Sequence, residues 1–531
     1  MGKRSFWGWG VEEAAFNEDQ RRNLKMMIQM QLGQLELEEL QPPRLDELSL
    51  PAPRLRPPES LASLFRDDPG ERAGHTYGKA FRDIVRGLDG DFRVAPDQVA
   101  YPGTEEELVS VLDWAADAGA AVIPYGGGST VTAGVEPRLE GDWKGAVSVD
   151  MSRLDRVLET DSTSRAAHIQ GGIYGPALEE ALKPHGWSLR HYPQSFEFST
   201  LGGWIATRSG GHFATLYTHI DDFVEALRVI TPSGSVETRR LPGSGAGPSP
   251  DRLFIGSEGI LGFITSAWMR VQDRPRFRAA ATVRFADFMD GAEAARMLAQ
   301  SGLYPTNCRL IEAREALNNG VGDGSRHLLL VGFESADHGL DAWMDRALEI
   351  CRGCGGEVKE GAGRTREEGE GAGDEAAGGW RQMFIQAPYM RDALARLGMV
   401  VETFETACTW DRFPEFHRNV VASVEAAARE VCGECMVTCR FTHVYPDGPA
   451  PYYTVIAPGR AGSQVAQWDQ IKAAASEALI REGGTITHHH SVGRDHKPWY
   501  DRQRPELFAE SLRAVKKTLD PSGMLNPGVL L

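Results

Sequence analysis

Residues 120–130 read Ala-Ala-Val-Ile-Pro-Tyr-Gly-Gly-Gly-Ser-Thr, so a short apolar run leads directly into three glycines and two hydroxyl side chains. The apolar part predicts a buried strand over Ala120–Pro124. Consecutive residues without a Cβ let backbone N–H groups converge on an anion, and Ser129 and Thr130 add hydroxyl donors. The stretch indicates a phosphate-binding loop after a strand, with a simple tight turn as the alternative.

The residues around this stretch alternate between helix and strand patterns from about Tyr101. Thr104 to Glu107 resembles a capping box that opens a helix, and Gly119 ends it. Further strands are predicted over residues 146–149, 166–170, 226–230 and 262–271, with a helix over 177–183.

Two more glycine clusters follow in order. One runs from Ser199 to Gly211 and contains Thr200-Leu201-Gly202-Gly203-Trp204, and the other is Gly256-Ser257-Glu258-Gly259-Ile260-Leu261-Gly262. Neither matches the GxGxxG of a nicotinamide Rossmann domain or a Walker GxxxxGK[ST]. Any one cluster alone is most simply a tight turn. Together, three clusters favour a large phosphate-bearing cofactor.

The rest of the chain predicts an arm, a second α/β-patterned region and a helical tail. A helical stripe within residues 11–40 precedes a proline-rich stretch from Pro42 to Pro58. Beyond Arg276, strands are predicted over 281–285, 307–311 and 328–333, and helices over 291–300 and 341–352. Residues 360–379 are rich in Gly and Glu, which predicts a solvated loop. Helices are predicted over 464–481 and 504–519.

The composition excludes several classes of protein. The 531 residues carry 57 Lys and Arg against 74 Asp and Glu, a formal net charge of −17, which disfavours nucleic-acid binding. No stretch is long and apolar enough for a membrane span. The seven cysteines include two C-x-x-C pairs, Cys351/Cys354 and Cys432/Cys435. They lie about 80 residues apart in sequence, so we interpret them as structural thiols and expect no metal.

A run of three histidines, His488-His489-His490, follows a short β-like stretch. On an extended chain neighbouring side chains alternate between faces, so at most His488 and His490 share one side. A three-histidine metal site from this run is therefore not expected. The run is either a polar turn or part of an active site.

Several longer motifs together resemble a known family. PYGGGST, SFEFSTLGGWIATRSGG and FIGSEGILGFIT resemble the flavin domain of the vanillyl-alcohol oxidase/p-cresol methylhydroxylase superfamily. HYPQSFEFSTLGGW, PYMRDALA, FETACTWDR and HHHSVGRDHKPW narrow the match to the alkyldihydroxyacetonephosphate synthase family. The landmarks run from residue 6 to the end of the chain.

The resemblance implies an α+β fold: a two-subdomain FAD-binding domain of the vanillyl-alcohol oxidase type plus a cap/substrate domain with a large antiparallel sheet flanked by helices. We assign residues 1–60 to an N-terminal helical and proline-rich arm, 61–275 to the FAD-binding domain and 276–485 to the cap. Residues 486–531 form a C-terminal segment that carries the His cluster and returns to the FAD domain.

The resemblance implies FAD, bound noncovalently because no flavin-linking His stands in or just before the first glycine loop. The implied cofactor residues are Pro124, Tyr125, Gly126, Gly127, Gly128, Ser129, Thr130, Pro193, Ser195, Thr200, Gly202, Gly203, Ala206, Thr207, Ser209, Ser257, Glu258, Gly259 and Ile264.

The implied catalytic residues are a tyrosine and several histidines. Counting from Tyr445 places the tyrosine at Tyr452, with Tyr453 as the alternative one residue further on. A phenol with a pKa near 10 needs nearby cations to act as a base, which the His run and Arg391 are suited to supply. The implied sets are Tyr452, His488, His489, His490 and His191 for catalysis, and Arg391 and Arg309 for the anionic substrate. A structural role for His191 stays open.

The implied reaction exchanges the acyl chain of acyl-dihydroxyacetone phosphate for a fatty alcohol, forming an ether lipid precursor without net redox change, through an adduct at flavin N5. The alternative is an FAD-dependent oxidase or dehydrogenase of a 2-hydroxy acid of the lactate or glycolate type. We expect small lipid substrates, a homodimer and a cytoplasmic location, with peripheral membrane contact as an open possibility. No peroxisomal targeting segment is found.

Overall fold

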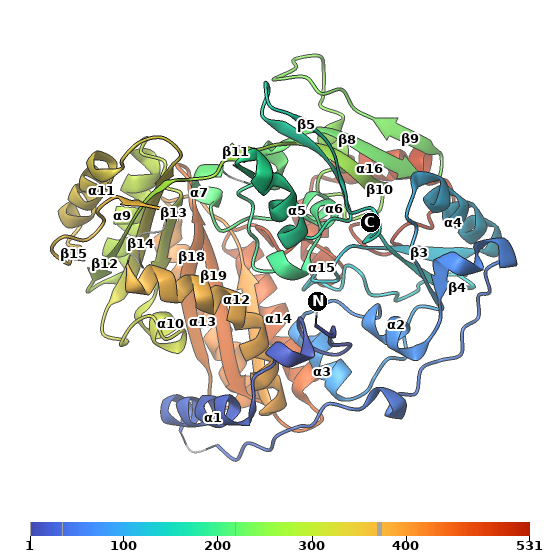
Figure 1. The fold of residues 1–531 in the computed structure, drawn as a ribbon. Coiled ribbons are helices and arrows are strands. Elements are labelled where there is room, and N and C mark those ends of the chain that lie inside the picture. The colour runs from blue at the N-terminus through green and yellow to red at the C-terminus, as the bar shows by residue number, and fades with distance from the viewer. Residues whose placement is uncertain (1, 34, 218, 369–373) are drawn as a thin grey trace.

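The computed structural model describes residues 2–33, 35–217, 219–368 and 374–531. The first glycine loop follows a small sheet in the right half of Figure 1. Its strands lie in the order β1 (Phe65–Arg66), β2 (Gln98–Ala100), β4 (Gly145–Asp150) and β3 (Ala120–Tyr125), and β2, β4 and β3 are parallel. The glycine loop therefore leaves the carboxyl end of a parallel strand, where ligands bind in α/β sheets.

The helix before β3 has the predicted boundaries. In α4 (Glu105–Ala118), the hydroxyl of Thr104 accepts the backbone N–H of Glu107 at 3.2 Å. Gly119 ends the helix with φ +65°, in the left-handed region where glycine carries no steric cost. Leu108, Val111, Leu112 and Ala115 bury the apolar face of the helix. Because the cap, stripe and stop are all local, the sequence was sufficient to predict this helix.

A second, antiparallel sheet lies against the other two glycine clusters. Its strand order is β5 (Val157–Asp161), β6 (Ala166–Gln170), β10 (Phe263–Arg270), β8 (Val224–Thr231) and β9 (Gly234–Glu237), and β7 (Trp187–Ser188) pairs with β11 (Gln272–Asp273) beside it. Besides α4, the helices in this part of the chain are α2 (Pro69–Gly74), α3 (Phe81–Leu88), α5 (Gly175–Leu182), α6 (Leu201–Thr207), α7 (Ala214–Tyr217) and α8 (Asp251–Phe254), and α3 packs into the core of the large sheet described next.

The left half of Figure 1 is built on a large antiparallel sheet. Its order is β15 (Glu357–Val358), β12 (Phe277–Phe285), β14 (His327–Ser335), β13 (Asn307–Ile311), β18 (Met436–Val444), β19 (Pro449–Pro458) and β17 (Met399–Glu405), with β16 (Arg366–Glu367) pairing to β12.

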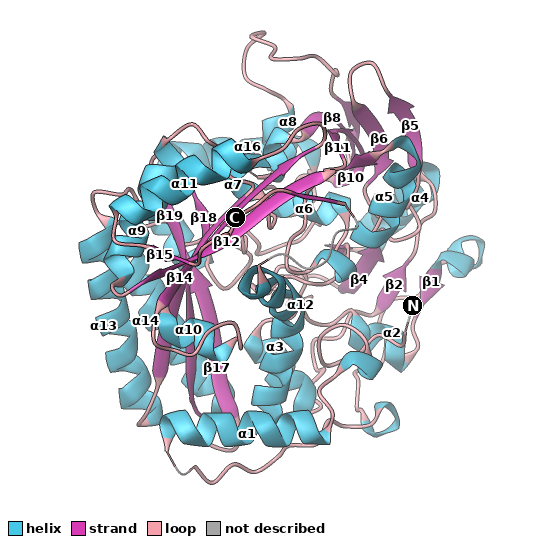
Figure 2. Ribbon diagram, turned by 60° about the vertical axis from the view of Figure 1, so that its left-hand side comes forward, coloured by secondary structure: helices cyan, strands magenta, loops and turns pink. Residues whose placement is uncertain are grey.

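Helices cover one face of this sheet and leave part of the other face to the site (Figure 2). The helices of this half and of the tail are α9 (Phe288–Gln300), α10 (Ala313–Asn318), α11 (Asp341–Gly353), α12 (Glu375–Arg396), α13 (Phe413–Cys432), α14 (Gln464–Arg481), α15 (Lys497–Gln503) and α16 (Glu506–Leu519). One apolar core joins the sheet to α9, α11, α13 and α14. Side chains alternate along each strand, so the remaining positions face the other way.

The N-terminal arm packs on its own chain. Leu24 and Ile28 of α1 (Glu18–Leu32) join the core of the large sheet. The backbone N–H of Leu40 then donates to the carbonyl of Arg396 at 2.7 Å. Further along, Arg54 forms an ion pair with buried Asp97 at 2.8 Å. The predicted helix stripe and extended arm are both present, and the arm links the two halves of the molecule.

The prediction of a loop over residues 360–379 is partly wrong. β16 lies within it, and α12 already begins at Glu375; residues 369–373 lie outside the described residues. Trp380, one turn into α12, is buried against the large sheet with Ile311 and Leu330, so burial of that ring extends the helix into a segment whose average composition is polar. None of the helices in the described residues combines the length and the apolar character needed to cross a bilayer.

Candidate active site

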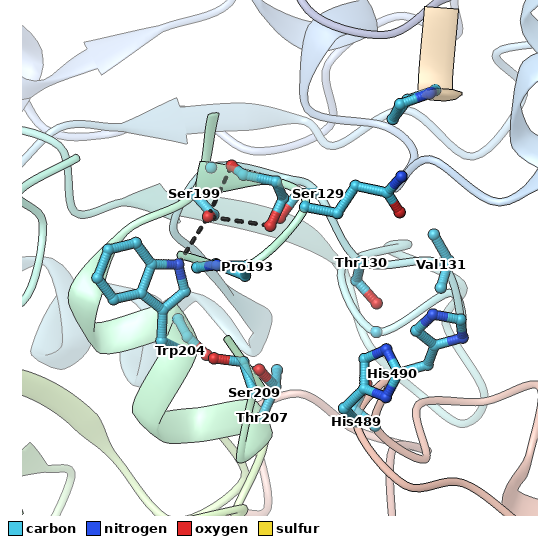
Figure 3. A pocket seen from close by; sticks show the side chains of 18 of the residues that line it. Ser129, Thr130, Val131, Pro193, Ser199, Trp204, Thr207, Ser209, His489 and His490 are labelled. Carbon is cyan, nitrogen blue, oxygen red and sulfur yellow. Dashed lines mark hydrogen bonds between the residues drawn. The ribbon is translucent and has the colours of Figure 1, made fainter. Parts of the chain in front are cut away.

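The three glycine clusters and the open face of the large sheet line one cavity of about 330 Å³ (Figure 3). The predicted cofactor residues that line it are Pro124, Tyr125, Gly126, Gly127, Gly128, Ser129, Thr130, Pro193, Ser195, Thr200, Gly202, Gly203, Ala206, Thr207, Ser209, Glu258, Gly259 and Ile264. The structure does not bring Ser257 to the wall, although it is buried behind it.

The glycines shape the cavity by geometry that other residues could not adopt without strain. Gly128 has φ +66°, the left-handed region in which a Cβ is costly. A Cβ on Gly127 would lie 1.9 Å from the Phe198 carbonyl oxygen, so any other residue there would push the first glycine cluster away from the second. The glycines, Ser129, Thr130 and Thr200 give this wall backbone and hydroxyl groups, which suit a cofactor that approaches the main chain closely.

A short hydrogen-bond network fixes the second cluster. Trp204 Nε1 donates to the Ser199 hydroxyl at 2.6 Å, and that hydroxyl donates to the Ser195 carbonyl at 2.8 Å (dashed in Figure 3). Trp204 is buried, and its contact holds the loop before α6 against the helix. The polar edge of the cavity is therefore preformed.

The third cluster joins the cavity to the C-terminal segment. The carboxylate of Glu258 accepts the backbone N–H groups of Val492 and Gly493 at 2.8 and 2.7 Å. Burial raises the pKa of Glu258 to about 7, partly offset by these two donors. Asn526 Nδ2 donates to the Glu258 carbonyl at 2.8 Å. The segment after the His run is thus attached to the cofactor side of the cavity.

The large sheet contributes Tyr452 and Arg440 from opposite positions on β19 and β18. The Arg440 guanidinium lies 3.8 Å from the centre of the Tyr452 ring, and it forms a buried ion pair with Glu315. Tyr453 points the other way, into the core, where its hydroxyl lies 3.2 Å from His417 Nδ1. Of the two tyrosines that counting left open, the structure places Tyr452 on the cavity wall.

The cation that lies beside Tyr452 is Arg440, whereas the sequence predicted the His run and Arg391. Burial raises the pKa of Tyr452, and the positive charge of Arg440 offsets part of that increase. The His run does not supply a cation, because burial lowers the pKa of His488 and His489 well below the usual range and that of His490 to about 4. Arg440 is therefore the group that sequence reasoning missed.

The His run forms a turn around a carboxylate, which contradicts the predicted extended chain. The Glu405 carboxylate accepts the backbone N–H groups of His488, His489 and His490 at 2.6, 3.2 and 2.9 Å. Because the turn removes the alternation of a strand, His489 and His490 both line the cavity and His488 does not. These donors and the neighbouring histidines lower the pKa of Glu405 to about 2, against the opposing effect of burial.

One ring nitrogen each of His443, His488 and His489 lies within 4.8 Å of the others. His443 Nε2 contacts the Gly211 carbonyl at 3.0 Å, while its Nδ1 is buried without a partner. This spacing could also hold a cation, so the expected lack of a metal stays a prediction. His191 lies outside the cavity wall, buried against Trp204 with Nε2 2.8 Å from the Ser209 hydroxyl.

The two predicted substrate arginines line the cavity in different electrostatic settings. Arg391 donates to the Asp392 carboxylate at 2.9 Å and to the Lys79 carbonyl, so its charge is already partnered. Arg309 is 1% exposed and has no ion pair among the described residues. Its nearest polar contacts are the Thr442 carbonyl at 3.4 Å and His212 Nδ1 at 3.5 Å, and its Nε has no partner.

Sequence reasoning also missed several cavity residues that come from distant segments. They include Trp9, Glu315, Thr403, Arg440, His443 and Asn526. Arg440 and Thr442 alternate with the buried residues Cys439 and Phe441 along β18, so polar residues at every second position were the available signal. Trp9 and Asn526 had no local signal, since only the fold brings both ends of the chain to the cavity.

The chain matches two families and several known proteins. Residues 96–239 match the family described as FAD binding domain, and residues 274–530 match FAD linked oxidases, C-terminal domain. Alkyldihydroxyacetonephosphate synthase of Dictyostelium discoideum is 29% identical over 497 residues, covering 89% of this chain and 79% of that protein. The Caenorhabditis elegans protein of the same name is 30% identical over 484 residues, covering 87% and 80%.

A solved structure of alkyldihydroxyacetonephosphate synthase superposes with a TM-score of 0.80, at 24% identity and 98% coverage of both chains. This likeness confirms the predicted α+β fold. The matches to the FAD binding domain and to the C-terminal domain of FAD linked oxidases confirm FAD as the predicted cofactor.

Proposed function

The chain belongs to the alkyldihydroxyacetonephosphate synthase family, and from that premise we propose that it exchanges the acyl chain of acyl-dihydroxyacetone phosphate for a fatty alcohol. In this exchange the bond between the substrate carbon and the ester oxygen breaks, and a bond from that carbon to the alcohol oxygen forms. The acyl chain leaves as a carboxylate. The alcohol proton is left over, so each turnover releases one proton and transfers no electrons overall.

The main support for the proposal is the setting of Arg309, which is buried in the cavity wall without a carboxylate partner among the residues that the structure describes. A buried guanidinium without a carboxylate partner is costly, and a bound phosphate supplies the missing negative charge with a geometry that matches the fork of the guanidinium. Burial lowers the pKa of Arg309 to about 9, which still leaves it charged at neutral pH. Arg309 and Tyr452 line the same cavity, so an anion on Arg309 brings the rest of the substrate to the phenol.

Tyr452 is proposed as the base that removes a proton from the substrate carbon and returns it once the ether bond has formed. The Arg440 charge 3.8 Å from its ring favours the phenolate form. Glu315 holds Arg440 in place through their buried ion pair. When bound, FAD supplies an electrophilic ring system that can stabilise negative charge at the substrate carbon. His489 and His490 are neutral cavity bases suited to accept the alcohol proton.

The three glycine clusters are proposed to hold FAD noncovalently. Gly126, Gly127 and Gly128, with Ser129 and Thr130, would bind the pyrophosphate through backbone N–H and hydroxyl groups. The residues around α6 would line the flavin, and Glu258, Gly259 and Ile264 would close the adenosine side. Denaturation with acid should release the flavin into the supernatant, and flavin that stays with the precipitated chain would contradict noncovalent binding.

Two measurements on the purified holoenzyme separate this function from its alternative. The proposal expects labelled fatty alcohol to enter acyl-dihydroxyacetone phosphate under anaerobic conditions without an electron acceptor. The alternative, oxidation of a 2-hydroxy acid, expects lactate or glycolate to bleach the anaerobic flavin spectrum. Bleaching without alcohol incorporation would replace the proposal with the alternative.

We further propose that the segments of the chain meet at residues 60, 275 and 485, as predicted. We also propose that the protein is a homodimer. Its proposed location is the cytoplasm, with peripheral contact to a membrane. Met26 and Met30, one turn apart on α1, are 50% and 86% exposed, which supports contact with a lipid surface that delivers long-chain substrates. Light scattering tests the dimer. Co-sedimentation with phosphatidylcholine vesicles, compared with Met26→Gln/Met30→Gln, tests the membrane contact.

A further inference from the structure

Four side chains form an unbroken series of hydrogen-bond contacts from the cavity toward the protein surface. His489 lines the cavity, and its Nδ1 lies 3.1 Å from His488 Nδ1. His488 Nε2 lies 2.8 Å from the Tyr445 hydroxyl, which lies 2.7 Å from His219 Nε2. His219 Nδ1, at the exposed end, lies 3.1 Å from the Arg208 carbonyl.

The Arg208 carbonyl determines where each proton lies, because a carbonyl can only accept. Neutral His219 must therefore carry its proton on Nδ1 and accept from the Tyr445 hydroxyl at Nε2. The Tyr445 oxygen accepts from His488 Nε2, and His488 Nδ1 then accepts from His489 Nδ1. One consistent arrangement results, and it leaves the lone pair of His489 on Nε2.

We propose that His489, His488, Tyr445 and His219 are a relay that carries the proton released in each turnover from the cavity to solvent. The proposal rests on the proposed exchange reaction, which leaves one proton in a buried cavity. His489 Nε2 accepts it, and the Nδ1 proton of His489 moves to His488. The Nε2 proton of His488 moves to Tyr445, and the phenolic proton moves to His219 Nε2. His219 then releases its Nδ1 proton to solvent, and the protons of the series return to the starting arrangement before the next turnover.

The surroundings of the path favour this transfer. Burial lowers the pKa of His488 and His489 well below the usual range, so neither stores the proton. Negative groups flank the path: Glu405 lies 3.5 Å from His489 Nδ1, and the charges of Glu405, Asp221, Asp222 and Asp447 act on Tyr445. A positive charge in transit is stabilised by these carboxylates. His488 Nε2 also lies 3.2 Å from His219 Nε2, which provides a direct branch past Tyr445.

The test uses His219→Ala in the FAD-loaded enzyme, with and without added imidazole. Loss of the terminal acceptor should lower kcat for alcohol exchange about 100-fold, the low end of general acid–base effects, with KM unchanged. Imidazole can occupy the space of the lost ring, so adding it should raise the kcat of His219→Ala several-fold. Tyr445→Phe should lower kcat less, since the direct contact between His219 and His488 remains. His338→Ala, an exposed histidine in the other half of the molecule, is the matched control and should change nothing.

Three results would overturn the relay. One is a His219→Ala variant with full turnover, and another is a loss that imidazole does not restore although the flavin spectrum is intact, which would assign His219 a structural role. The third is about one transition-metal ion per chain in the active wild-type protein, because a metal on His443, His488 and His489 would use the lone pairs that the relay needs. A wild-type holoenzyme without alcohol exchange would instead refute the proposed function itself.

Discussion

At the scale of single residues, the charge that acts on Tyr452 is set by a pair rather than by one cation. Arg440 lies over the phenol ring, and Glu315 neutralises part of its charge from the other side. Thr438 donates its hydroxyl to the same carboxylate, which holds Glu315 in place. Arg440 therefore offsets part of the increase that burial causes in the pKa of Tyr452, while Glu315 offsets the cost of burying the guanidinium.

The first prediction is that Tyr452→Phe abolishes exchange while FAD stays bound. The variant keeps the ring and its contact with Arg440 and loses only the proton-accepting oxygen, so turnover should fall at least 100-fold. Turnover of labelled alcohol and the visible flavin spectrum measure the two effects. Tyr453→Phe is the control, because Tyr453 faces the core and should leave turnover within about threefold of wild type. Loss of activity in Tyr453→Phe alone would move the base to that residue.

The second prediction concerns the unpaired guanidinium of Arg309. Arg309→Gln should raise KM for acyl-dihydroxyacetone phosphate more than tenfold, because a hydrogen bond to a charged group contributes about 1.5–3 kcal/mol. Arg309→Lys should restore little of it, since a lysine lacks the planar fork. Steady-state kinetics with Arg314→Gln as control, an exposed arginine at the start of α10, tests this. An unchanged KM in Arg309→Gln would place the phosphate elsewhere.

At the scale of elements, the alternation of side chains along β19 shows which of two neighbouring tyrosines faces the cavity, which counting residues along the sequence could not decide. Tyr452 and Tyr453 are neighbours in sequence, and only the pairing of β18, β19 and β17 fixes which of them faces the cavity. The single strands β13 and β14 could be predicted from apolar periodicity alone. The pairing of β13 with β18, about 130 residues later in sequence, could not be predicted, because register depends on contacts far apart in the chain.

The His turn shows the same limit more sharply. Local sequence predicted an extended chain at residues 485–490, and a carboxylate from β17 converts it into a turn by accepting three successive N–H groups. Glu405 lies more than 80 residues before the run, so no local sequence pattern predicts its contact with the three backbone N–H groups. The prediction that the run belongs to an active site came from the family resemblance, and only the fold shows that His489 and His490 line the cavity while His488 does not.

The third prediction is that Glu405→Gln destabilises the turn in a pH-dependent way. The folded pKa of Glu405 is about 2, below its ordinary value of 4.5, so its stabilisation is fully present above pH 4.5 and is lost as the pH falls toward 2. The variant should unfold at a lower temperature than wild type at pH 7, and the gap should narrow below pH 4.5. Thermal unfolding from pH 7 to pH 3 measures it, with the exposed Glu349→Gln as control. A gap that does not change with pH would contradict the assignment of the charge.

At the scale of the whole molecule, the cavity is closed by both ends of the chain. Trp9 lines it from the N-terminal segment, and its backbone N–H donates to the Asp392 carboxylate at 2.5 Å. Asn526 lines it from the C-terminal segment and donates to the Gly134 carbonyl at 3.0 Å. The glycine clusters could be predicted to bind a cofactor because their signal is local. The closure could not, because it needs the arm and the tail to return across the finished fold.

The fourth prediction follows from this closure. Arg4 Nη2 donates to the Gly127 carbonyl at 3.2 Å, and the Arg4 guanidinium lies 4.6 Å from the centre of the Phe198 ring, so the N-terminal segment braces the first glycine loop. Arg4→Met/Trp9→Ala should weaken FAD binding by about tenfold or more and lose part of the thermal stabilisation that added FAD gives, since a ligand stabilises only the state that binds it. The fluorescence of free flavin after dilution of the holoenzyme measures how much FAD dissociates from the protein. Lys3→Met, at an exposed neighbour paired with Glu12, should leave it unchanged. Equal FAD affinity in all three proteins would mean that the glycine clusters hold the cofactor without the N-terminal segment.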